Sequence, residues 1–270
     1  MDATDIKMTK LNQYLCELGS VAVAFSGGVD SAFLLQTAHE VLGEHVVAVT
    51  VQSGMFPMRE LKQAEQFCVQ AGIRHRICIV DEQKIEGFAA NPGNRCYLCK
   101  RQIMHQILEI AKEERLAFVV EGSNLDDEGD YRPGQQAIAE LGIKSPLKTA
   151  GMTKADIRKY ANQAGLSVWN KPSAACLASR FVYGETITKE KLSMVDHAEQ
   201  LLLDMGFRQM RVRIHGTMAR IEVCEDEFDR LIVPDIRHRI ICALRSYGFS
   251  YVAMDLQGYR TGSMNETLSK

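Results

Sequence analysis

The sequence lacks the features of membrane, secreted and nucleic-acid-binding proteins. No run approaches the roughly 18 apolar residues of a transmembrane helix, and the opening segment MDATDIKMTKLNQYL is too polar and too mixed in charge for a signal peptide. The formal net charge of −2 gives no electrostatic reason to expect nucleic acid or an anionic membrane as a partner. We therefore expect a cytoplasmic protein with neither of these partners.

Internal repeats and low-complexity segments are also absent, and tryptophan occurs once. Trp169 precedes a loop that contains Cys176, and we expect it to pack into the core, with stacking on the substrate as the alternative. The chain has 270 residues, of which 46% are hydrophobic. This length allows one large domain or two moderate ones, each able to bury a core.

Cysteine, in contrast, is abundant, with eight residues. In a reducing cytoplasm these should be thiols, metal ligands or catalysts, and not disulfides. Five lie in apolar or amphipathic runs and are expected to be small buried residues: Cys16, Cys68, Cys78, Cys224 and Cys242. The other three have different surroundings: Cys96, Cys99 and Cys176.

Apolar strands and amphipathic helices alternate over the first 165 residues. The predicted strands are 21–25, 45–51, 74–80 and 117–122, and the helices between them are 31–42, 58–71 and 98–115. Further helices are predicted at 5–18 and 153–164. This alternation predicts right-handed βαβ units, and the almost entirely apolar strands predict a parallel sheet covered by helices on both faces.

The pattern changes after the irregular stretch 167–186. A helix at 188–205, a two-stranded ribbon over MRVRIHGTMARIEVC that turns at His215-Gly216, a helix at 227–247 and a strand at 250–256 form an α-β-β-α-β unit. We therefore predict an α/β domain over 1–181 and a smaller α+β domain over 182–270.

The string SGGVDS, residues 26–31, joins the first predicted strand to the following helix. Gly27 and Gly28 let backbone N–H groups approach an anion at a helix N-terminus, and Ser26 and Ser31 can donate hydrogen bonds. Asp30 would be repelled by phosphate but could hold a Mg²⁺ that phosphates share. The string matches neither the dinucleotide fingerprint nor the Walker loop, whose lysine is missing.

Two other strand ends are expected at the same edge of the sheet, although each, taken singly, could be an ordinary turn. Val51 and Ser53 close the second strand, and Gly122 follows the fourth. Open α/β sheets place ligands at the carboxyl ends of their strands.

The SGG-x-DS string resembles the PP-loop of the ATP pyrophosphatases, which have the adenine nucleotide alpha hydrolase-like fold. The resemblance implies that ATP is cleaved between its α- and β-phosphates and that AMP is placed on a substrate oxygen. Pyrophosphate is then the leaving group and no γ-phosphoryl group is transferred, which fits the missing lysine.

Six longer strings resemble the LarE family, the ATP-dependent sulfur transferases of nickel-pincer cofactor biosynthesis for lactate racemase. The strings are SGMFPMRE, NRCYLCK, EGSNLDDEGDYRPG, NKPSAACLASRF, RVRIHG and GYRTGSMNE, and they span essentially the whole chain. The resemblance implies that a carboxylate of a pyridinium biscarboxylate mononucleotide is adenylated, and that sulfur replaces AMP to leave a thiocarboxylate. ATP and Mg²⁺ are the implied cofactors.

The sulfur source has two readings within this family. Cys96, Cys99 and Cys176 resemble the three-cysteine branch, which holds a 4Fe–4S cluster with an extra sulfur. Alternatively, Cys176 donates its own sulfur. The Cys96/Cys99 pair has other readings as half of a zinc site, a redox pair or incidental residues at a helix start.

Three arginines are candidates for the substrate phosphate, and Arg180 is a further, weaker candidate. Arg211 and Arg213 alternate on a predicted strand and so share a face, and Arg260 is a weaker candidate. An acidic loop with Asp127 and Asp130 could also hold Mg²⁺. We expect a homo-oligomer. An ammonia-using amidating synthetase on the same loop and a nucleotide-binding regulatory protein remain the alternatives.

Overall fold

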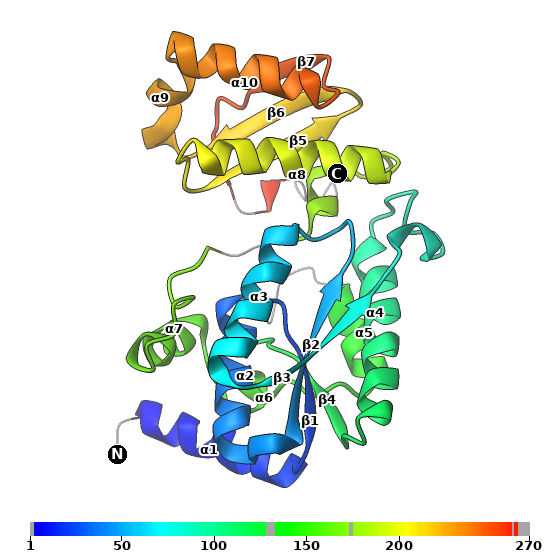
Figure 1. Cartoon of the computed structure of the whole chain (residues 1–270), viewed down its shortest axis with the longest axis vertical. Helices are drawn as coiled ribbons and strands as arrows, with labels where there is room; N and C mark the ends of the chain where they lie inside the picture. Colours follow the sequence, from blue (N-terminus) through cyan, green and yellow to red (C-terminus); the bar gives the residue numbers. More distant parts are fainter. Residues whose placement is uncertain (1–2, 128–132, 173–174, 261, 264–270) are drawn as a thin grey trace. The chain divides into compact units, whose positions relative to one another are not determined.

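Four parallel strands form a sheet in the order β3-β2-β1-β4 (Figure 1). The strands are β1 Val21–Ala24, β2 Val46–Gln52, β3 Arg74–Ile79 and β4 Phe118–Val120. Val21 pairs with Val46 on one side and with Phe118 on the other, so β1 lies inside the sheet. The computed structural model describes residues 3–127, 133–172, 175–260 and 262–263. The predicted parallel α/β sheet is confirmed.

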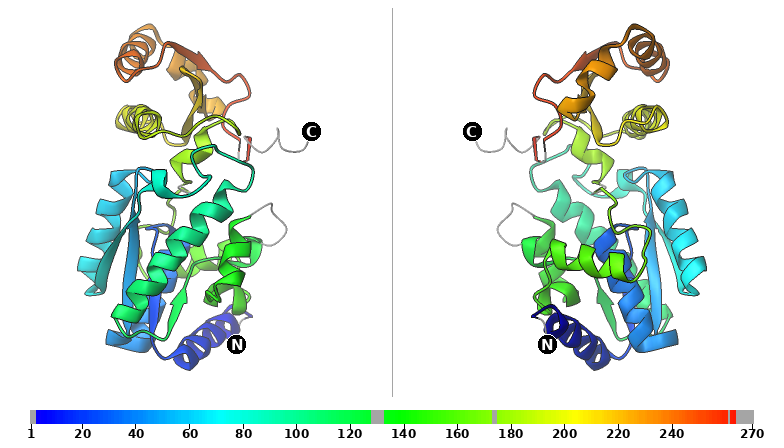
Figure 2. Two further views of the ribbon diagram at one scale, coloured as in Figure 1. Left: turned by 90° about the vertical axis from the view of Figure 1, so that its right-hand side faces the viewer. Right: turned by 90° about the vertical axis from the view of Figure 1, so that its left-hand side faces the viewer.

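Helices cover this sheet on both faces. The connections from β1 to β2 and from β2 to β3 run through α2 (Val29–Leu42) and α3 (Met58–Ala71), whereas α4 (Arg95–Glu113) leads to β4 from the opposite face (Figures 1 and 2). Right-handed crossovers require this reversal, because the chain changes direction across the sheet. A topological switch point therefore lies between β1 and β4, where open α/β sheets bind ligands.

The remaining helices of this part complete the core beside β1. They are α1 (Ala3–Leu18), α5 (Gly134–Glu140), α6 (Pro146–Thr149) and α7 (Lys154–Gln163). Leu15 of α1, Leu34 of α2 and Ile157 of α7 are fully buried members of one hydrophobic cluster. α7 begins with a capping box, in which Thr153 and Asp156 each accept a hydrogen bond from the other's backbone N–H.

The strand β3 departs from the expectation that helices cover every strand. It lies at the edge of the sheet, and Ile79 is 74% exposed. Arg74 and Arg76 of β3 pair with Glu114 near the end of α4. Charged side chains of this kind discourage an edge strand from pairing with another chain.

A second sheet has the order β5-β6-β7, with β5 (Met210–His215) and β6 (Met218–Val223) antiparallel and β7 (Tyr251–Met254) parallel to β6. Two helices, α8 (Lys189–Asp204) and α10 (Pro234–Ser246), pack against each other and cover one face of this sheet (Figure 2). Leu202, Val212 and Leu244 are fully buried there.

The chain divides into two compact units, and the second includes an internal segment. Unit 1 is 1–81 with 96–174, and unit 2 is 82–95 with 175–270. Within unit 2, the Asn91 side chain donates to the Val182 carbonyl at 2.6 Å, and the Ile187 N–H donates to the Ala89 carbonyl at 2.9 Å. The sequence pattern instead placed a single boundary after Phe181, because hydrogen bonds between distant segments leave no local signal.

One predicted element is wrong. Residues 227–247 are not a continuous helix but form α9 (Phe228–Ile232) and α10, which begins at Pro234. Val233 adopts φ −52° and ψ 131° between them. Proline disfavours a helical conformation in the residue before it and is well tolerated in the first turn of a new helix.

Three side chains predicted to be buried are exposed. Trp169 is 39% exposed, so it does not pack into the core as expected. Cys16 and Cys242 are exposed as well. Both lie on amphipathic helices whose buried stripes are formed by other residues, including Leu15 on α1 and Leu244 on α10. Cys68 and Cys78 are buried as predicted, whereas Cys224 is partly exposed.

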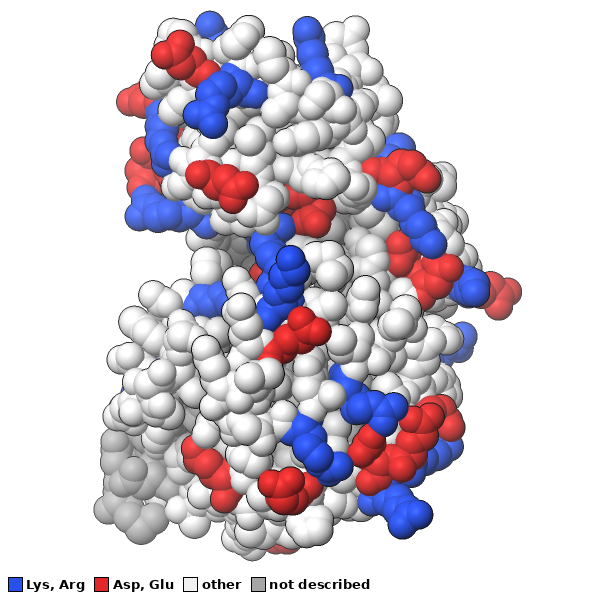
Figure 3. Space-filling model, in the orientation of Figure 1, with Lys and Arg blue, Asp and Glu red and all other residues white. Residues whose placement is uncertain are grey.

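Charges of both signs are interspersed on the face shown in Figure 3. No helix among the residues that the structure describes is long and apolar enough to cross a membrane.

Candidate active site

Residues 26–31, the phosphate loop, follow β1 and lead into α2. The Ser26 and Ser31 hydroxyl groups lie 3.0 Å apart, and the Ser31 hydroxyl donates to the Gly28 carbonyl at 3.1 Å. Gly27 has φ +73°, which favours glycine. Gly28 is the N-cap of α2 and provides no side-chain cap. The N–H groups of the first helical turn therefore face the loop, where an anion can accept their hydrogen bonds.

Gly122 brings the end of β4 against this loop. A Cβ at Gly122 would lie 3.0 Å from the Ser31 nitrogen and 3.2 Å from its Cα. A larger residue would therefore displace the first turn of α2. β1 and β4 are parallel neighbours in the sheet. Their carboxyl ends therefore lie at the same edge, as predicted.

Val51 and Ser53 lie at the carboxyl end of β2, the other neighbour of β1. Val51 is the penultimate residue of β2, and the Ser53 hydroxyl accepts a hydrogen bond from the Met55 N–H at 3.3 Å. Ser53 thus holds the turn that follows the strand. The residues predicted to bind the nucleotide, which follow β1, β2 and β4, therefore lie along one edge of the sheet.

Asp30, the predicted magnesium ligand, contacts two side chains from distant segments. The Lys154 ammonium forms an ion pair with Asp30 Oδ2, and the Asn124 amide lies 3.5 Å from Oδ1. Asn124 also accepts a hydrogen bond from the Asp126 N–H at 2.9 Å. The Asn124 amide thus directs its NH₂ group towards Asp30 and its oxygen towards the Asp126 N–H, and the Asp30 carboxylate is the oxygen ligand that suits Mg²⁺. Asp130, named above with Asp127, lies outside the described residues.

A second lysine contacts the backbone of the loop's glycines. Lys171 Nζ donates to the Gly27 carbonyl at 3.2 Å, to Glu60 at 2.6 Å and to Gln63 at 2.7 Å. Sequence reasoning noted that the loop lacks a lysine but did not find these two. They are 124 and 144 residues from their partners, so spacing within the loop motif could not show them.

Sequence reasoning also missed the role of Glu121, which is buried directly after β4. Its carboxylate accepts hydrogen bonds from the Ser123 hydroxyl at 2.8 Å and the Ser145 hydroxyl at 2.6 Å, and Lys100 lies at 3.8 Å. This network fixes the conformation of the Glu121-Gly122-Ser123-Asn124 turn. The string of Glu, Gly, Ser and Asn directly after a predicted strand was the feature of the sequence that could have indicated this role.

Cys96 and Cys99 occupy the first turn of α4, in unit 1. Residues three apart on a helix share a face, so both thiols project from the same side of α4. Cys96 is exposed and Cys99 is partly exposed, with Sγ 3.5 Å from Met55 Sδ. Cys176 belongs to unit 2, so the three-cysteine arrangement stays a prediction.

Cys176 precedes a short turn of 3-10 helix at Leu177–Arg180. The Arg180 guanidinium donates to the Cys176 carbonyl at 3.1 Å and forms a two-point ion pair with Glu199. Burial alone would raise the pKa of Glu199, but Arg180 lowers it and keeps the carboxyl group charged. The pair is almost completely buried, with 4% and 2% of the side chains exposed.

The three candidate arginines have different surroundings. Arg213 is buried and forms a two-point pair with Glu222, while Arg260 lies 3.8 Å from Asp255. Arg211 lies over the Tyr259 ring, and burial, followed by the neighbouring Arg180 charge, lowers the pKa of its guanidinium. Arg211 also donates to the Met210 carbonyl at 2.7 Å, and its binding of a substrate phosphate stays a prediction.

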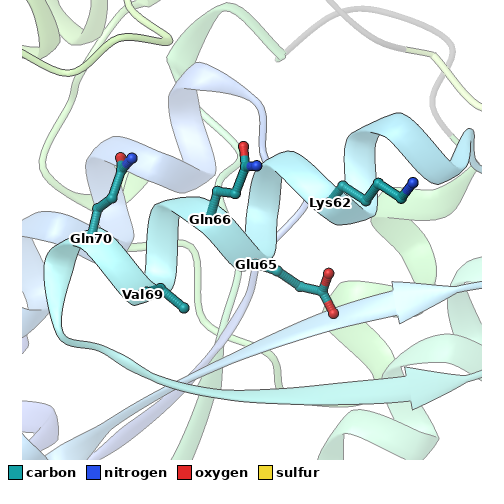
Figure 4. A pocket seen from close by; sticks show the side chains of 5 residues that line it. All are labelled: Lys62, Glu65, Gln66, Val69 and Gln70. Atoms are coloured by element: carbon teal, nitrogen blue, oxygen red, sulfur yellow. The ribbon is translucent and has the colours of Figure 1, made fainter.

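Two further features lie away from these residues. Cys224, Asp226 and Glu227 are the one set of potential metal ligands within 4.8 Å of one another in the described part of the chain, and Arg208 already pairs with Asp226 at 2.8 Å. A surface pocket along α3 is lined by Lys62, Glu65, Gln66, Val69 and Gln70 (Figure 4). Neither feature includes a predicted site residue.

The fold and the phosphate loop define a PP-loop ATP pyrophosphatase, and comparisons with known proteins agree. Residues 15–90 match the family described as asparagine synthase. Over 265 residues, 98% of this chain and 95% of the relative, the sequence is 37% identical to the pyridinium-3,5-bisthiocarboxylic acid mononucleotide synthase of Lactiplantibacillus plantarum. The chain belongs to the family of that synthase, the LarE family, as its sequence motifs predicted.

Two other relatives show how far the likeness extends. An uncharacterized protein of Synechocystis sp. is 38% identical over 264 residues, which are 98% of each chain. The argininosuccinate synthase of Natronomonas pharaonis is 30% identical over 161 residues, 55% of this chain and 40% of the relative.

Proposed function

We propose that this protein is an ATP-dependent sulfur transferase that converts a carboxylate of a pyridinium biscarboxylate mononucleotide into a thiocarboxylate, in biosynthesis of the nickel-pincer cofactor. The observation that carries the proposal is an intact phosphate loop at the carboxyl end of β1 in a chain that is similar over nearly its full length to a bisthiocarboxylic acid mononucleotide synthase.

The first half-reaction activates the carboxylate. A carboxylate is a poor electrophile, so its oxygen attacks the α-phosphorus of ATP, and the bond to the β-phosphate oxygen breaks. The products are an acyl adenylate and pyrophosphate. The N–H groups at the start of α2 would hold the departing pyrophosphate, and the Asp30 carboxylate would provide an oxygen ligand for Mg²⁺.

In the second half-reaction a sulfur nucleophile attacks the acyl carbon and AMP leaves. Cys96 and Cys99 offer two soft thiolate donors from one helix face, which suits an iron–sulfur cluster completed by Cys176. When bound, such a cluster would supply the transferable sulfur. In the alternative route, Cys176 gives up its own sulfur.

The arginine cluster of unit 2 suits the substrate phosphate. Arg180, Arg211 and Arg213 carry three positive charges, and the buried Glu199 and Glu222 carry two negative ones. Arg220 and Arg260 add two positive charges to the cluster and Asp255 adds one negative charge, so positive charge remains in excess, which favours an anion beside Arg211. That the protein forms a homo-oligomer also stays a prediction.

The test of the proposed function is product analysis. The protein is incubated with ATP, Mg²⁺ and the pyridinium biscarboxylate mononucleotide, and AMP and pyrophosphate should form in equal amounts. Formation of ADP and phosphate would contradict the proposal. Activity with ammonia that survives Cys176→Ser would favour an amidating synthetase, and ATP binding without pyrophosphate release would favour a regulatory protein.

The sulfur source is tested on anaerobically purified protein by iron and sulfide analysis and intact mass. Bound iron that is lost in Cys96→Ala and retained in Cys242→Ser, an exposed cysteine on α10, supports the cluster. A mass loss of about 34 Da after turnover, which marks conversion of cysteine to dehydroalanine, supports the sacrificial route.

A further inference from the structure

The peptide that joins Gly27 to Gly28 lies in the middle of the phosphate loop. It carries the Gly27 carbonyl and the Gly28 N–H, and because it is trans, these two groups point in opposite directions. The Gly28 N–H donates a long hydrogen bond, at 3.5 Å, to the Ser26 hydroxyl. A bond of this length is weak, so the N–H keeps its capacity to donate to an anion at the start of α2.

The side chains of this dipeptide cannot fix its orientation, because both residues are glycine. Glycine adopts φ of either sign at little cost, and Gly27 has φ +73°. Rotation of the peptide would turn the Gly27 carbonyl oxygen towards the bound phosphates, which would repel it. A contact from outside the dipeptide is therefore needed to hold the N–H in the productive direction.

Lys171 provides such a contact. Its ammonium donates to the Gly27 carbonyl at 3.2 Å, and on α3 it donates to Glu60 at 2.6 Å and to Gln63 at 2.7 Å. An ammonium has three N–H donors, so each of them has an acceptor. The side chains of Lys171 and Glu60 are each 17% exposed, which limits competition from water.

Both ends of this contact are held in place. The Lys171 N–H donates to the Val168 carbonyl at 3.0 Å, in the turn that follows α7. The first turn of α3 packs against the loop, since a Cβ at Gly27 would lie 3.6 Å from the Glu60 carbonyl oxygen and 3.7 Å from Ala64 Cβ. The ammonium therefore joins three segments of unit 1: the phosphate loop, the start of α3 and the stretch after α7.

We propose that Lys171 is a positioning residue, which holds the Gly27–Gly28 peptide so that the Gly28 N–H donates to the pyrophosphate part of ATP. Lys171 itself does not touch the nucleotide. Its ammonium binds the Gly27 carbonyl on one side of the peptide and thereby presents the N–H on the other. The proposal rests on the proposed function only in taking magnesium–ATP as the ligand.

The sequence allows this one peptide to be observed by NMR. Gly27 and Gly28 are the single pair of adjacent glycines in the chain. Protein made with glycine labelled at its carbonyl carbon and its nitrogen should therefore give one signal when each amide N–H is correlated with the preceding carbonyl carbon. Magnesium α,β-methylene-ATP, which cannot be cleaved between its α- and β-phosphates, should shift the amide proton of this signal in the wild type.

Lys171→Met should change the same signal in two ways. The Gly27 carbonyl carbon should shift before any ligand is added, because it loses the hydrogen bond from the ammonium. The shift of the Gly28 proton at saturating analogue should become smaller, because the N–H is no longer held towards the phosphates. Lys62→Met, at an exposed position of α3, is the matched control and should leave the signal as in the wild type.

Calorimetry with the same analogue measures the effect on affinity. In Lys171→Met the dissociation constant should rise about 10-fold, as expected for loss of a hydrogen bond made by a charged group. This variant also leaves Glu60 without its counter-charge. Glu60→Gln/Lys171→Met removes both charges and should bind the analogue as weakly as Lys171→Met does.

Recovery of wild-type affinity by the double variant would overturn the proposal, because the loss would then come from the charge of Glu60. A Gly28 signal that does not respond to the analogue in the wild type, or that Lys171→Met leaves unchanged, would overturn it as well. AMP lacks the β- and γ-phosphates, so an equal loss of AMP affinity in Lys171→Met would also contradict it. A failure of sulfur transfer is distinguishable, because it would leave the signal and the analogue affinities unaffected.

Discussion

The two units hold their positive charges in different ways. In unit 1, Lys154 and Lys171 reach the phosphate loop through flexible chains and lie at partly exposed positions. In unit 2, Arg180 and Arg213 are buried, and each binds a glutamate through two parallel hydrogen bonds. The lysine contacts are therefore partly open to solvent, whereas the arginine contacts are buried ion pairs within unit 2.

The difference follows from the chemistry of the two side chains. A guanidinium presents a rigid fork that matches a carboxylate, and burial makes separation of such a pair costly. An ammonium is a compact charge that can change partners with little rearrangement. The two units therefore differ in how easily their charged contacts can rearrange, with the buried arginine pairs of unit 2 the harder ones to separate.

The largest expected effect comes from neutralising one member of a buried pair. Glu199→Gln leaves Arg180 buried without its counter-charge and should reduce the free energy of unfolding by about 3–5 kcal/mol. The matched change in unit 1, Asp30→Asn, affects a partly exposed pair and should cost about 0–1 kcal/mol, although it should abolish ATP cleavage. Denaturant titration of both variants measures the two losses in free energy of unfolding. Equal losses for Glu199→Gln and Asp30→Asn would contradict the expected difference between the buried and the partly exposed pair.

A smaller loss in free energy of unfolding is expected from a substitution where the end of β4 packs against the phosphate loop. Gly122→Ala places a Cβ 3.0 Å from the Ser31 nitrogen, and because backbone cannot move aside easily, the cost should be about 1–3 kcal/mol. Binding of the uncleavable ATP analogue should weaken as well. Gly134→Ala is the control, since its Cβ would make ordinary contacts at 3.6 Å. Normal analogue binding by Gly122→Ala would show that the close approach is not needed.

The smallest effect concerns the capping box that supports Lys154. Burial would raise the pKa of Asp156, but Lys7 and the Thr153 hydrogen bonds lower it from 3.8 to about 2. The carboxylate therefore stabilises the fold above about pH 4, and this contribution is lost as the pH falls towards 2. Asp156→Asn should cost about 1 kcal/mol at neutral pH.

Unfolding experiments between pH 2 and 7 check this expectation. Asp156→Asn should lose part of the pH dependence of stability that the wild type shows between pH 4 and 2. Asp229→Asn, an exposed carboxylate in the first turn of α9, serves as the control. The same pH profile for Asp156→Asn and the wild type would mean that the Lys7 contact does not matter in solution.

The sequence was most informative where structure depends on local pattern. The four parallel strands, α3 and the capped start of α7 follow from hydrophobic period and cap residues, and the family follows from short strings. It was least informative about partners distant in the chain. Lys154 and Lys171 reach the loop from more than a hundred residues away, and the glutamates that bind Arg180 and Arg213 could not be chosen from the many in the chain.

The segment 82–95 has a consequence for how the protein can be divided. The chain leaves unit 1 after Asp81, returns after Arg95 and leaves again after Ala174. A gene fragment that stops at Phe181 would still encode 82–95 but not the residues that Asn91 and Ala89 bind. Neither unit is a contiguous stretch of the chain, so a single cut at any one position divides at least one of them.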